Sequence, residues 1–363
     1  MRVDLLVQKK GVLMKARRFR PVRTLALYLA SSLLVFTAIF ATFAHSSHAY
    51  AQGIQRTAPL TCPQPPQNVN LMTLSDTQLR LYGLPSRATI NENTKEWAFL
   101  FSHAKHRICG SYPDPQKRIH VLRSAVSTGP YTGFSAPNWA GNVTEGNRGE
   151  YRDAQVDLYV PAISLNVYNA LASFWTGVGG DSDFTSPAKV VQAGVTAQVV
   201  WNGVQFAQAN TSWWEVYPGY AEQDLPLGRL DVGDHIHIYA GSNLNNDGYD
   251  YFYMQNISYN TYNSYTLYGS ANFSDSESGE CIAERLKVNG SYAPLAQFSN
   301  SGQPANTMKF YSCAIYDIQR GGNGIGNLPH HYYYISDGTQ TLASPGPIVN
   351  NGFDYPVIWY HGT

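Results

Sequence analysis

The sequence predicts an all-β protein: an antiparallel two-sheet β-sandwich, preceded by a short helical or irregular N-terminal region. The first observation is composition, because the 363 residues include 26 Tyr while charged residues make up only 14%. Aromatic and β-branched residues favour strands, and the 31 Gly and 20 Pro supply turns. The second observation is the pattern after residue 135, where short segments alternate apolar and polar residues at hairpin-like spacing. Many short strands separated by turns indicate a sandwich or barrel.

Residues 1–51 are predicted to be a signal peptide. A basic stretch, Lys15–Arg23, precedes the apolar run Leu25–Phe43, and Ala49–Ala51 fits a small-x-small cleavage site. The alternative is an uncleaved anchor, because about 19 apolar residues nearly span a bilayer. We expect cleavage and secretion to the extracellular space, with no stable membrane association afterwards.

The charge balance excludes an obvious nucleic-acid partner. Residues 1–51 hold eight of the 25 Lys and Arg but one of the 25 Asp and Glu, which leaves 17 basic and 24 acidic side chains. That remainder has an acidic excess and no basic patch of the kind that binds phosphate backbones. We expect a monomer.

Four cysteines follow the signal segment, namely Cys62, Cys109, Cys281 and Cys313. An even number in an exported chain predicts two disulfides. Proximity along the sequence favours Cys62–Cys109 and Cys281–Cys313, but three connectivities remain open. No CxxC spacing occurs, so a zinc site built from cysteines is not expected.

Residues 52–134 differ from the rest and are predicted to form a linker followed by a pro-region or small N-terminal subdomain. Ser75-Asp76 caps a short helical pattern that ends at Tyr82. A second helical segment covers about 94–106, and its apolar residues recur at i, i+3 and i+4: Trp97, Leu100 and Phe101.

Residues 135–363 are predicted to form the β-sandwich. Arg152–Val160 alternates strictly, and Val195–Trp201 alternates again. Asn202-Gly203 is the dipeptide of a two-residue type I′ hairpin, with Val204–Ala209 as the partner strand. Further strands are predicted over Trp213–Tyr217, His235–Ala240, Tyr251–Tyr259 and Tyr262–Tyr268. Residues 301–363 are strand-like and either complete the sandwich or cap it.

Gln192 is the first residue with a candidate chemical role. The apolar residues of its predicted strand, from Val191 to Trp201, share one face, whereas Gln192, Gly194 and Thr196 share the other. That second face is too polar for the core, so Gln192 is expected to point to solvent or into a cleft. A strand Gln is usually a solvated surface residue, and its interest depends on what surrounds it.

Glu284 is the second candidate. It alternates with the apolar residues Ile282 and Leu286, and a carboxyl among apolar neighbours favours its neutral form. Its protonation would then change in mildly acidic water, as acid/base catalysis requires. The alternatives are a bulge that returns Glu284 to solvent, or a salt bridge with Arg285 or Lys287.

Other candidates carry weaker signals. Trp213 and Glu215 share a strand face, which suits either a substrate-binding wall or core packing. His235 and His237 have a spacing that could hold a metal, but no third ligand is evident and a solvated polar face is favoured. The remaining candidates were assigned to turns and loops: Asp181, Asp183, His330 and His331.

The order of six short segments resembles the glutamic peptidase, or eqolisin, family. The order and spacing of the segments are more specific than any one of them. They are Asn138-Trp139-Ala140-Gly141, Trp175-x-Gly177, Gln192-x-Gly194, Trp213-Trp214-Glu215-Val216-Tyr217-Pro218, Gly233-Asp234 and Ala283-Glu284.

The resemblance implies two curved sheets of jelly-roll or concanavalin-like kind, with the active site on a concave face. It implies that Glu284 activates a water and later protonates the leaving amine, while Gln192 holds the water and stabilises the oxyanion. Substrate would contact Trp139, Trp175, Trp213 and Glu215. No metal or organic cofactor is implied.

The chain departs from the family pattern, which suggests a divergent, bacterial-type member. Arg285 follows Glu284 where the family has an aromatic or apolar residue, and Thr196 stands where the family often has an acid. These changes bear on the pH optimum more than on the reaction. Two other functions remain open: a carbohydrate-binding sandwich without catalysis, and a glycoside hydrolase that uses Glu215 and Glu284.

Overall fold

The structure is a computed structural model. It describes residues 60–61, 64–66, 69–82, 84, 87, 90, 94–104, 106–109, 118–119, 133–180, 189–243, 249–268 and 277–361. All of them belong to one compact unit, residues 56–363. The predicted signal peptide, Cys62 of the predicted Cys62–Cys109 disulfide, Asp181 and Asp183 lie outside the described residues. Within the described ranges, no helix has the length and apolar character needed to cross a membrane.

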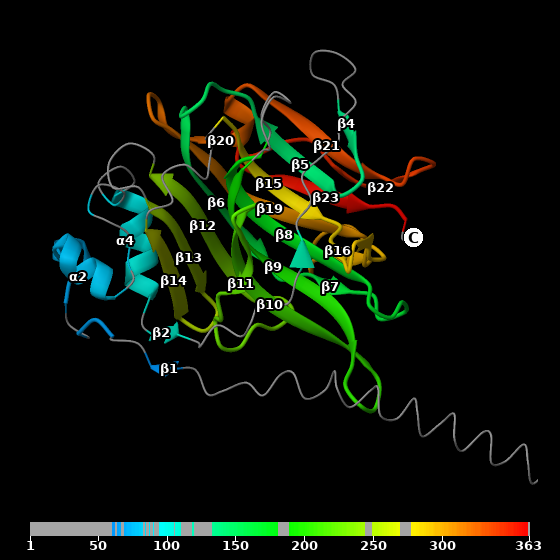
Figure 1. The fold of residues 1–363 in the computed structure, drawn as a ribbon, viewed down its shortest axis with the longest axis horizontal. Helices are drawn as coiled ribbons and strands as arrows, with labels where there is room; N and C mark the ends of the chain where they lie inside the picture. The colour runs from blue at the N-terminus through cyan, green and yellow to red at the C-terminus, as the bar shows by residue number, and fades with distance from the viewer. Residues whose placement is uncertain are drawn as a thin grey trace, which may run out of the picture. The chain divides into compact units, whose positions relative to one another are not determined.

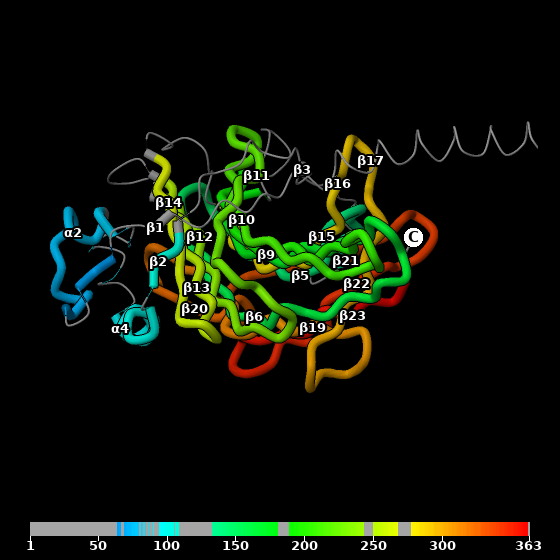
Figure 2. The backbone as a smooth tube through the Cα atoms, turned by 90° about the horizontal axis from the view of Figure 1, so that it is seen from below, coloured from blue at the N-terminus to red at the C-terminus, as the bar shows by residue number. Residues whose placement is uncertain are grey.

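The protein is an antiparallel β-sandwich, as predicted, and its two sheets are shown in Figures 1 and 2. We call the first the front sheet. Successive pairings carry it through β4 (Phe134–Ala136), β21 (His330–Ser336), β5 (Trp139–Thr144), β15 (Gly279–Glu284), β8 (Leu171–Gly179), β9 (Val190–Trp201), β10 (Phe206–Tyr217) and β11 (Tyr220–Asp224).

The second layer, called the back sheet, packs against the front sheet. It runs through β1 (Leu60–Thr61), β2 (His106–Cys109), β14 (Thr261–Tyr268), β13 (Tyr249–Asn256), β12 (His235–Asn243), β6 (Tyr151–Tyr159) and β19 (Thr307–Asp317), and β19 also pairs with β20 (Gly321–Gly324) and β23 (Tyr355–Trp359). The two layers are joined because β22 (Thr341–Pro345) pairs with both β21 and β23. The C-terminal residues therefore complete the sandwich.

Short elements surround the two sheets. They are the 3₁₀ helices η1 (Leu71–Thr73) and η2 (Ile325–Asn327), the helices α2 (Asp76–Leu81) and α4 (Thr94–His103), the pair β7 (Ala162–Ile163) with β18 (Phe298–Ser299), and a small ladder of β3 (Arg118–Ile119), β16 (Lys287–Val288) and β17 (Ser291–Tyr292).

Strand alternation builds the core as the sequence predicted. Val191, Ala193 and Val195 of β9 face inward and join a buried apolar cluster, together with Val156 and Leu158 of β6. Because side chains alternate between the faces of a strand, Gln192 and its same-face neighbours must point away from this core. The outer face of the front sheet therefore receives the polar residues of β9.

The N-terminal helices cover the outer face of the back sheet. Ser75 caps the first helix as predicted, and with Gln78 it forms a capping box: the Ser75 hydroxyl accepts from the Gln78 amide and the Gln78 side chain accepts from the Ser75 amide. The ring of Trp97 in α4 packs against the rings of Tyr239 and Tyr253 on the back sheet, with each pair of ring centroids 5.3 Å apart. This helical part of residues 52–134 thus lies on the opposite side of the sandwich from Gln192.

Two local predictions were wrong. The turn after Trp201 is a four-residue loop, because the Asn202 side chain accepts from the amides of Val204 and Gln205 and the ladder resumes only at Phe206. The segment around His330 and His331 is a strand rather than a loop, because β21 pairs with β5. Polar, Tyr-rich alternation concealed this strand from a single-sequence reading.

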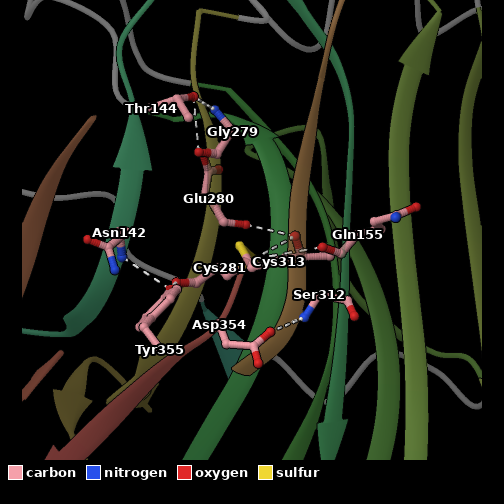
Figure 3. The surroundings of a disulfide bond; sticks show 11 residues. Asn142, Thr144, Gln155, Gly279, Glu280, Cys281, Ser312, Cys313, Asp354 and Tyr355 are labelled. Carbon is pink, nitrogen blue, oxygen red and sulfur yellow. Dashed lines mark hydrogen bonds between the residues drawn. A yellow bond between two sulfur atoms is a disulfide. The ribbon is translucent and has the colours of Figure 1, made fainter. Parts of the chain in front are cut away.

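One predicted disulfide is confirmed and links the two sheets. Cys281 of β15 and Cys313 of β19 are bonded, with their Cα atoms 6.5 Å apart (Figure 3). The same region is tied by the Tyr355 hydroxyl, which donates to the Cys281 carbonyl and accepts from the Asn142 amide. The bond lies three residues before Glu284 in the chain, so it fixes the strand that carries this carboxyl.

Removing the disulfide with Cys281→Ala/Cys313→Ala is expected to lower the free energy of unfolding by about 3–4 kcal/mol. The reason is the loss of a cross-link that closes a loop of sequence separation 32, which frees the unfolded chain. Urea unfolding of the variant and the wild type measures the difference. A variant as stable as the wild type would show that packing of β15 on β19 holds the layers without the cross-link.

His235 and His237 belong to an ion pair on the back sheet and not, as was favoured, to a solvated polar face. His237 is 1% exposed, and its Nδ1 lies 3.1 Å from Oδ1 of Asp157, which is 3.5 Å from Nε2 of His235. Burial would raise the pKa of Asp157, but hydrogen bonds and charge from both histidines hold it well below its usual range. Burial would lower the pKa of His237, but Asp157 raises it above its ordinary value.

The two shifts act at opposite ends of the acid range. Asp157 contributes to the stability of the fold above its ordinary pKa of about 4. This stabilisation is lost as the pH falls through its lower pKa in the folded protein. His237 contributes to the stability of the fold below its ordinary pKa of about 6.5. This stabilisation is lost as the pH rises through its higher pKa in the folded protein. The pair is therefore charged, and stabilising, in mildly acidic water.

Candidate active site

The catalytic and substrate-binding residues that the family resemblance implies lie on the outer face of the front sheet: Gln192, Glu284, Trp139, Trp175, Trp213 and Glu215. Strand register places these residues in three parallel rows across β5, β15, β8, β9 and β10. The rows are Trp139–Glu284–Ser173–Thr196–Thr211, then Gly141–Ile282–Trp175–Gly194–Trp213, then Val143–Glu280–Gly177–Gln192–Glu215.

Glu284 is fully buried at the end of β15 and is held by two donors. The Asn138 side-chain amide donates to Oε1 at 3.0 Å, and the Trp175 indole N–H donates to Oε2 at 2.7 Å. Neither the bulge nor the exposed position considered for Glu284 therefore occurs. Two neutral donors on separate oxygens thus orient the carboxyl.

The apolar neighbours predicted for Glu284 need a correction. Ile282 shares its face, but the sandwich core is formed by the alternate residues Cys281 and Ala283. Leu286 packs in a separate cluster with Leu171 and Ala293, because the regular alternation of β15 ends at Glu284. The carboxyl is thus buried on the outer face, among indole rings and Ile282.

Gln192 is also buried, with 1% of its surface exposed, and so does not point to bulk solvent. Its Nε2 donates to Oε2 of Glu215 at 2.6 Å, across the directly paired positions of β9 and β10. Its Oε1 is buried and has no hydrogen-bond partner within the described parts of the chain. An amide carries two N–H donors, so one remains beyond the bond to Glu215.

Gln192 and Glu284 lie diagonally across β8. Their strands, β15 and β9, lie on either side of β8. Glu284 pairs with Ser173 of β8 and Gln192 pairs with Gly177, four residues further along that strand. At about 4.8 Å per strand and 3.3 Å per residue, these offsets are roughly 10 Å and 13 Å between backbones. The two side chains therefore project from the same sheet face, in rows on either side of the row that contains Trp175.

Glycines make room for the indole rings in the central row. A Cβ on Gly194 would lie 2.5 Å from Cβ of Trp175 and 2.6 Å from Cζ2 of Trp213, closer than real side chains approach. The two indoles thus lean over Gly194 from both sides. Gly177 makes room in the next row for a different neighbour, because a Cβ there would lie 3.0 Å from Cβ of Gln192.

The tryptophans of the predicted substrate wall are buried, and their contacts place them beneath the site. The Trp213 indole donates to Oγ1 of Thr196 at 3.0 Å, and the Thr196 hydroxyl lies 2.9 Å from that of Ser173. Trp139 packs against Trp175 with ring centroids 5.2 Å apart. Thr196, which replaces an acid of the family pattern, thus takes part in a neutral hydroxyl chain.

Two groups at this site were missed by the sequence analysis. Asn138 was noted only as part of a motif, yet it orients Glu284 from 146 positions away in the sequence. Glu280 is fully buried in the row of Gln192, and its shared parity with Glu284, four residues later, was the available signal.

A third missed feature is an edge formed by β21. Nε2 of His331 lies 2.7 Å from the Tyr333 hydroxyl, and Nδ1 of His331 contacts Glu145. The Tyr333 ring packs on Trp139 with centroids 6.1 Å apart. β21 therefore extends the apolar floor of the site beyond β5.

The described residues include no group of three or more His, Cys, Asp or Glu side chains arranged to hold a metal ion. His235 and His237 lie on the back sheet, away from Gln192 and Glu284. The arrangement on the front sheet is a buried carboxyl and a buried amide on one face, each oriented by a neighbour. Such a pair can transfer a proton and stabilise an oxyanion.

Comparison with known proteins finds one family model and several solved structures that are similar to this chain. Residues 137–308 match the sequence profile of the Peptidase A4 family. Scytalido-glutamic peptidase, in a crystal structure with a transition state analog inhibitor, is similar at 18% identity and TM-score 0.50, over 62% of this chain and 98% of that chain. Aspergilloglutamic peptidase from Aspergillus niger is similar at 20% identity and TM-score 0.42, over 53% and 99%. No curated protein matches the sequence.

Proposed function

We propose that this chain, whose residues 137–308 match the model of the Peptidase A4 family, is a secreted endopeptidase that hydrolyses peptide bonds in acid with Gln192 and Glu284. One observation carries the proposal. Glu284 is buried and oriented by Asn138 and Trp175 on the same sheet face as Gln192, which is itself oriented by Glu215.

Glu284 acts first as the general base. Its carboxylate takes a proton from a water molecule as that water attacks the scissile carbonyl carbon, and it later gives the proton to the leaving amine nitrogen. The hydrogen bonds from Asn138 and Trp175 hold both carboxyl oxygens in place, so the proton moves without rotation of the side chain. A carboxyl suits this role because it can both accept a proton and return it.

Gln192 stabilises the oxyanion. One N–H of its amide is bound by Glu215, and the other donates to the negative charge that develops on the carbonyl oxygen. Oε1, which is buried without a partner in the described chain, accepts from the attacking water. A neutral amide remains a donor at every pH, which fits catalysis in acid.

Secretion and acid activity have separate support. Export is proposed from the signal-peptide pattern of residues 1–51. Activity at acidic pH is proposed because the general base is a carboxyl group. The Asp157–His237 pair supports stability in the same pH range, since both members are charged there.

The test is a cleavage assay on denatured protein between pH 2 and 7, with pepstatin and a metal chelator present. We expect cleavage in the acidic part of this range that neither compound suppresses, because the proposed pair contains neither two aspartates nor a metal. Absence of cleavage at every pH would reject the peptidase function.

A carbohydrate-binding module remains the second candidate because of one exposed aromatic group. Trp201 is 52% exposed and packs edge-on against Phe206, which also stacks with Tyr168. Flat, exposed rings of this kind suit sugar stacking. Retention on polysaccharide together with no cleavage in the assay above would favour this function. The glycoside hydrolase is less favoured, because Glu215 binds the Gln192 amide and lies three strands from Glu284.

A further inference from the structure

A rigid hairpin begins directly after the Glu284 strand. β16 and β17 are joined by Asn289 and Gly290, whose φ angles of 52° and 83° suit the tight turn that Asn-Gly favours. The Arg285 guanidinium and the Lys287 ammonium lie 5.2 Å and 4.7 Å from the ring of Tyr292. The hairpin is thus held in shape beside the carboxyl proposed as the base.

β16 pairs with β17 along one edge and with β3, from the N-terminal region, along the other. β3 is antiparallel to β16, with Ile119 opposite Lys287 and Arg118 opposite Val288. β3 lies outside the matched domain of residues 137–308. It is therefore an extended segment, foreign to the peptidase domain, that is added to an edge three residues from Glu284.

β3 also lies over the face that holds the site. Besides pairing with β16, it approaches β11, the strand at the far edge of the front sheet beyond Glu215. In Figure 2, β3 lies between β11 and the β16–β17 hairpin, on the side of the front sheet away from the back sheet. The two residues of β3 therefore contact elements at both ends of the face that carries Gln192 and Glu284, namely β11 and β16.

Burial of the site agrees with a covered face. The outer face of a sheet in a two-layer sandwich ordinarily meets water. Here Gln192, Glu215 and Glu284 on that face are only 1%, 2% and 0% exposed. A polypeptide substrate could not reach them in this arrangement without displacing what covers them.

We propose that the edge of β16 opposite β17, at Lys287–Val288, is the subsite that binds the extended backbone of a polypeptide substrate as an added strand. In the resting protein β3 occupies this edge. An exposed strand edge presents unpaired N–H and C=O groups, and an extended peptide pairs with them whatever its side chains. β3 and the substrate then compete for one edge. This inference rests on the proposed peptidase function and names how its substrate is held.

The first experiment frees the edge in the full-length chain. Arg118→Pro/Ile119→Pro removes the backbone N–H groups of β3, whereas the matched control Arg118→Ala/Ile119→Ala keeps them. We expect the proline variant to lower KM for a peptide substrate by about tenfold with little change in kcat, since more molecules have an open edge. The alanine control should keep the KM of the wild type. Equal KM values for all three proteins would overturn the proposal.

The second experiment needs no cleavage. A synthetic peptide of residues 114–123 is labelled, and its binding to the proline variant that also carries Glu284→Gln is followed by fluorescence anisotropy. We expect binding that weakens at least about tenfold when the peptide is N-methylated at Arg118 and Ile119, because strand pairing needs these N–H groups. Equal binding of both peptides, or none, would overturn the proposal.

The two experiments separate the possible failures. If no protein cleaves the substrate but the peptide binds through its backbone, the peptidase function fails and the docking edge stands. If the proline variant does not fold, the same pair of peptides is compared as inhibitors of the wild type. Only the unmethylated peptide should inhibit competitively, and equal inhibition by both would overturn the proposal.

Discussion

Glu284→Gln is expected to lower kcat for acid cleavage by about 10²–10⁴-fold, because the amide cannot take a proton from water or return it to the leaving amine. The substitution keeps the size of the side chain, but its single amide oxygen can accept from Trp175 or from Asn138 and not from both. KM should change little, since the carboxyl acts in the transition state. Steady-state kinetics on a quenched fluorescent peptide measures both constants.

Glu280→Gln is the matched control for this prediction. Glu280 is, like Glu284, a fully buried glutamate on the same face of β15. It lies in the row of Gln192 rather than beside Trp175. We expect it to keep most of the wild-type kcat. If Glu280→Gln removed activity while Glu284→Gln kept it, the general base would be Glu280. Circular dichroism of both variants checks that each is folded.

Gln192→Ala is expected to lower kcat by about 10²–10³-fold, because it removes a preorganised donor to the oxyanion. The loss should be similar across the acidic range, since a neutral amide does not titrate. The bond to Glu215 is also lost, which leaves that buried carboxyl with one fewer donor. Measuring kcat from pH 2 to 6 for the variant and the wild type gives the ratio at each pH.

Gln198→Ala is the control for Gln192→Ala. Gln198 lies on the same strand and face, six residues along, where it pairs with Leu171 rather than Gly177. Its truncation should leave kcat unchanged. A Gln192→Ala enzyme with wild-type kcat would show that the oxyanion is stabilised by another group. A loss confined to KM would instead make Gln192 a substrate-binding residue.

Much of the fold followed from local patterns. Period-two alternation in β9 predicted which residues enter the core, and the structure confirms Val191, Ala193 and Val195 there. The cap at Ser75-Asp76 and the apolar stripe at Trp97 likewise predicted α2 and α4. These signals succeed because each depends on contacts within one strand or one helix.

The failures have physical reasons too. The loop after Trp201 resembled a two-residue hairpin, but the Asn202 side chain satisfies two amides and so stabilises a longer turn. β21 carries polar and Tyr residues on both faces, so alternation could not reveal it, and only pairing with β5 makes it a strand. Glu280 was overlooked although it shares parity with Glu284.

The sequence by itself determined the fold class, the family resemblance and the face of β9 from which Gln192 projects, because alternation is a property of a single strand. Only the tertiary structure decided that Asn138 and Trp175 hold Glu284, that Glu215 holds Gln192, and that β3 lies on the edge of β16. Each of these contacts depends on which strands are neighbours and in what register. Neighbours and register are set by pairing between distant segments, which no local pattern contains.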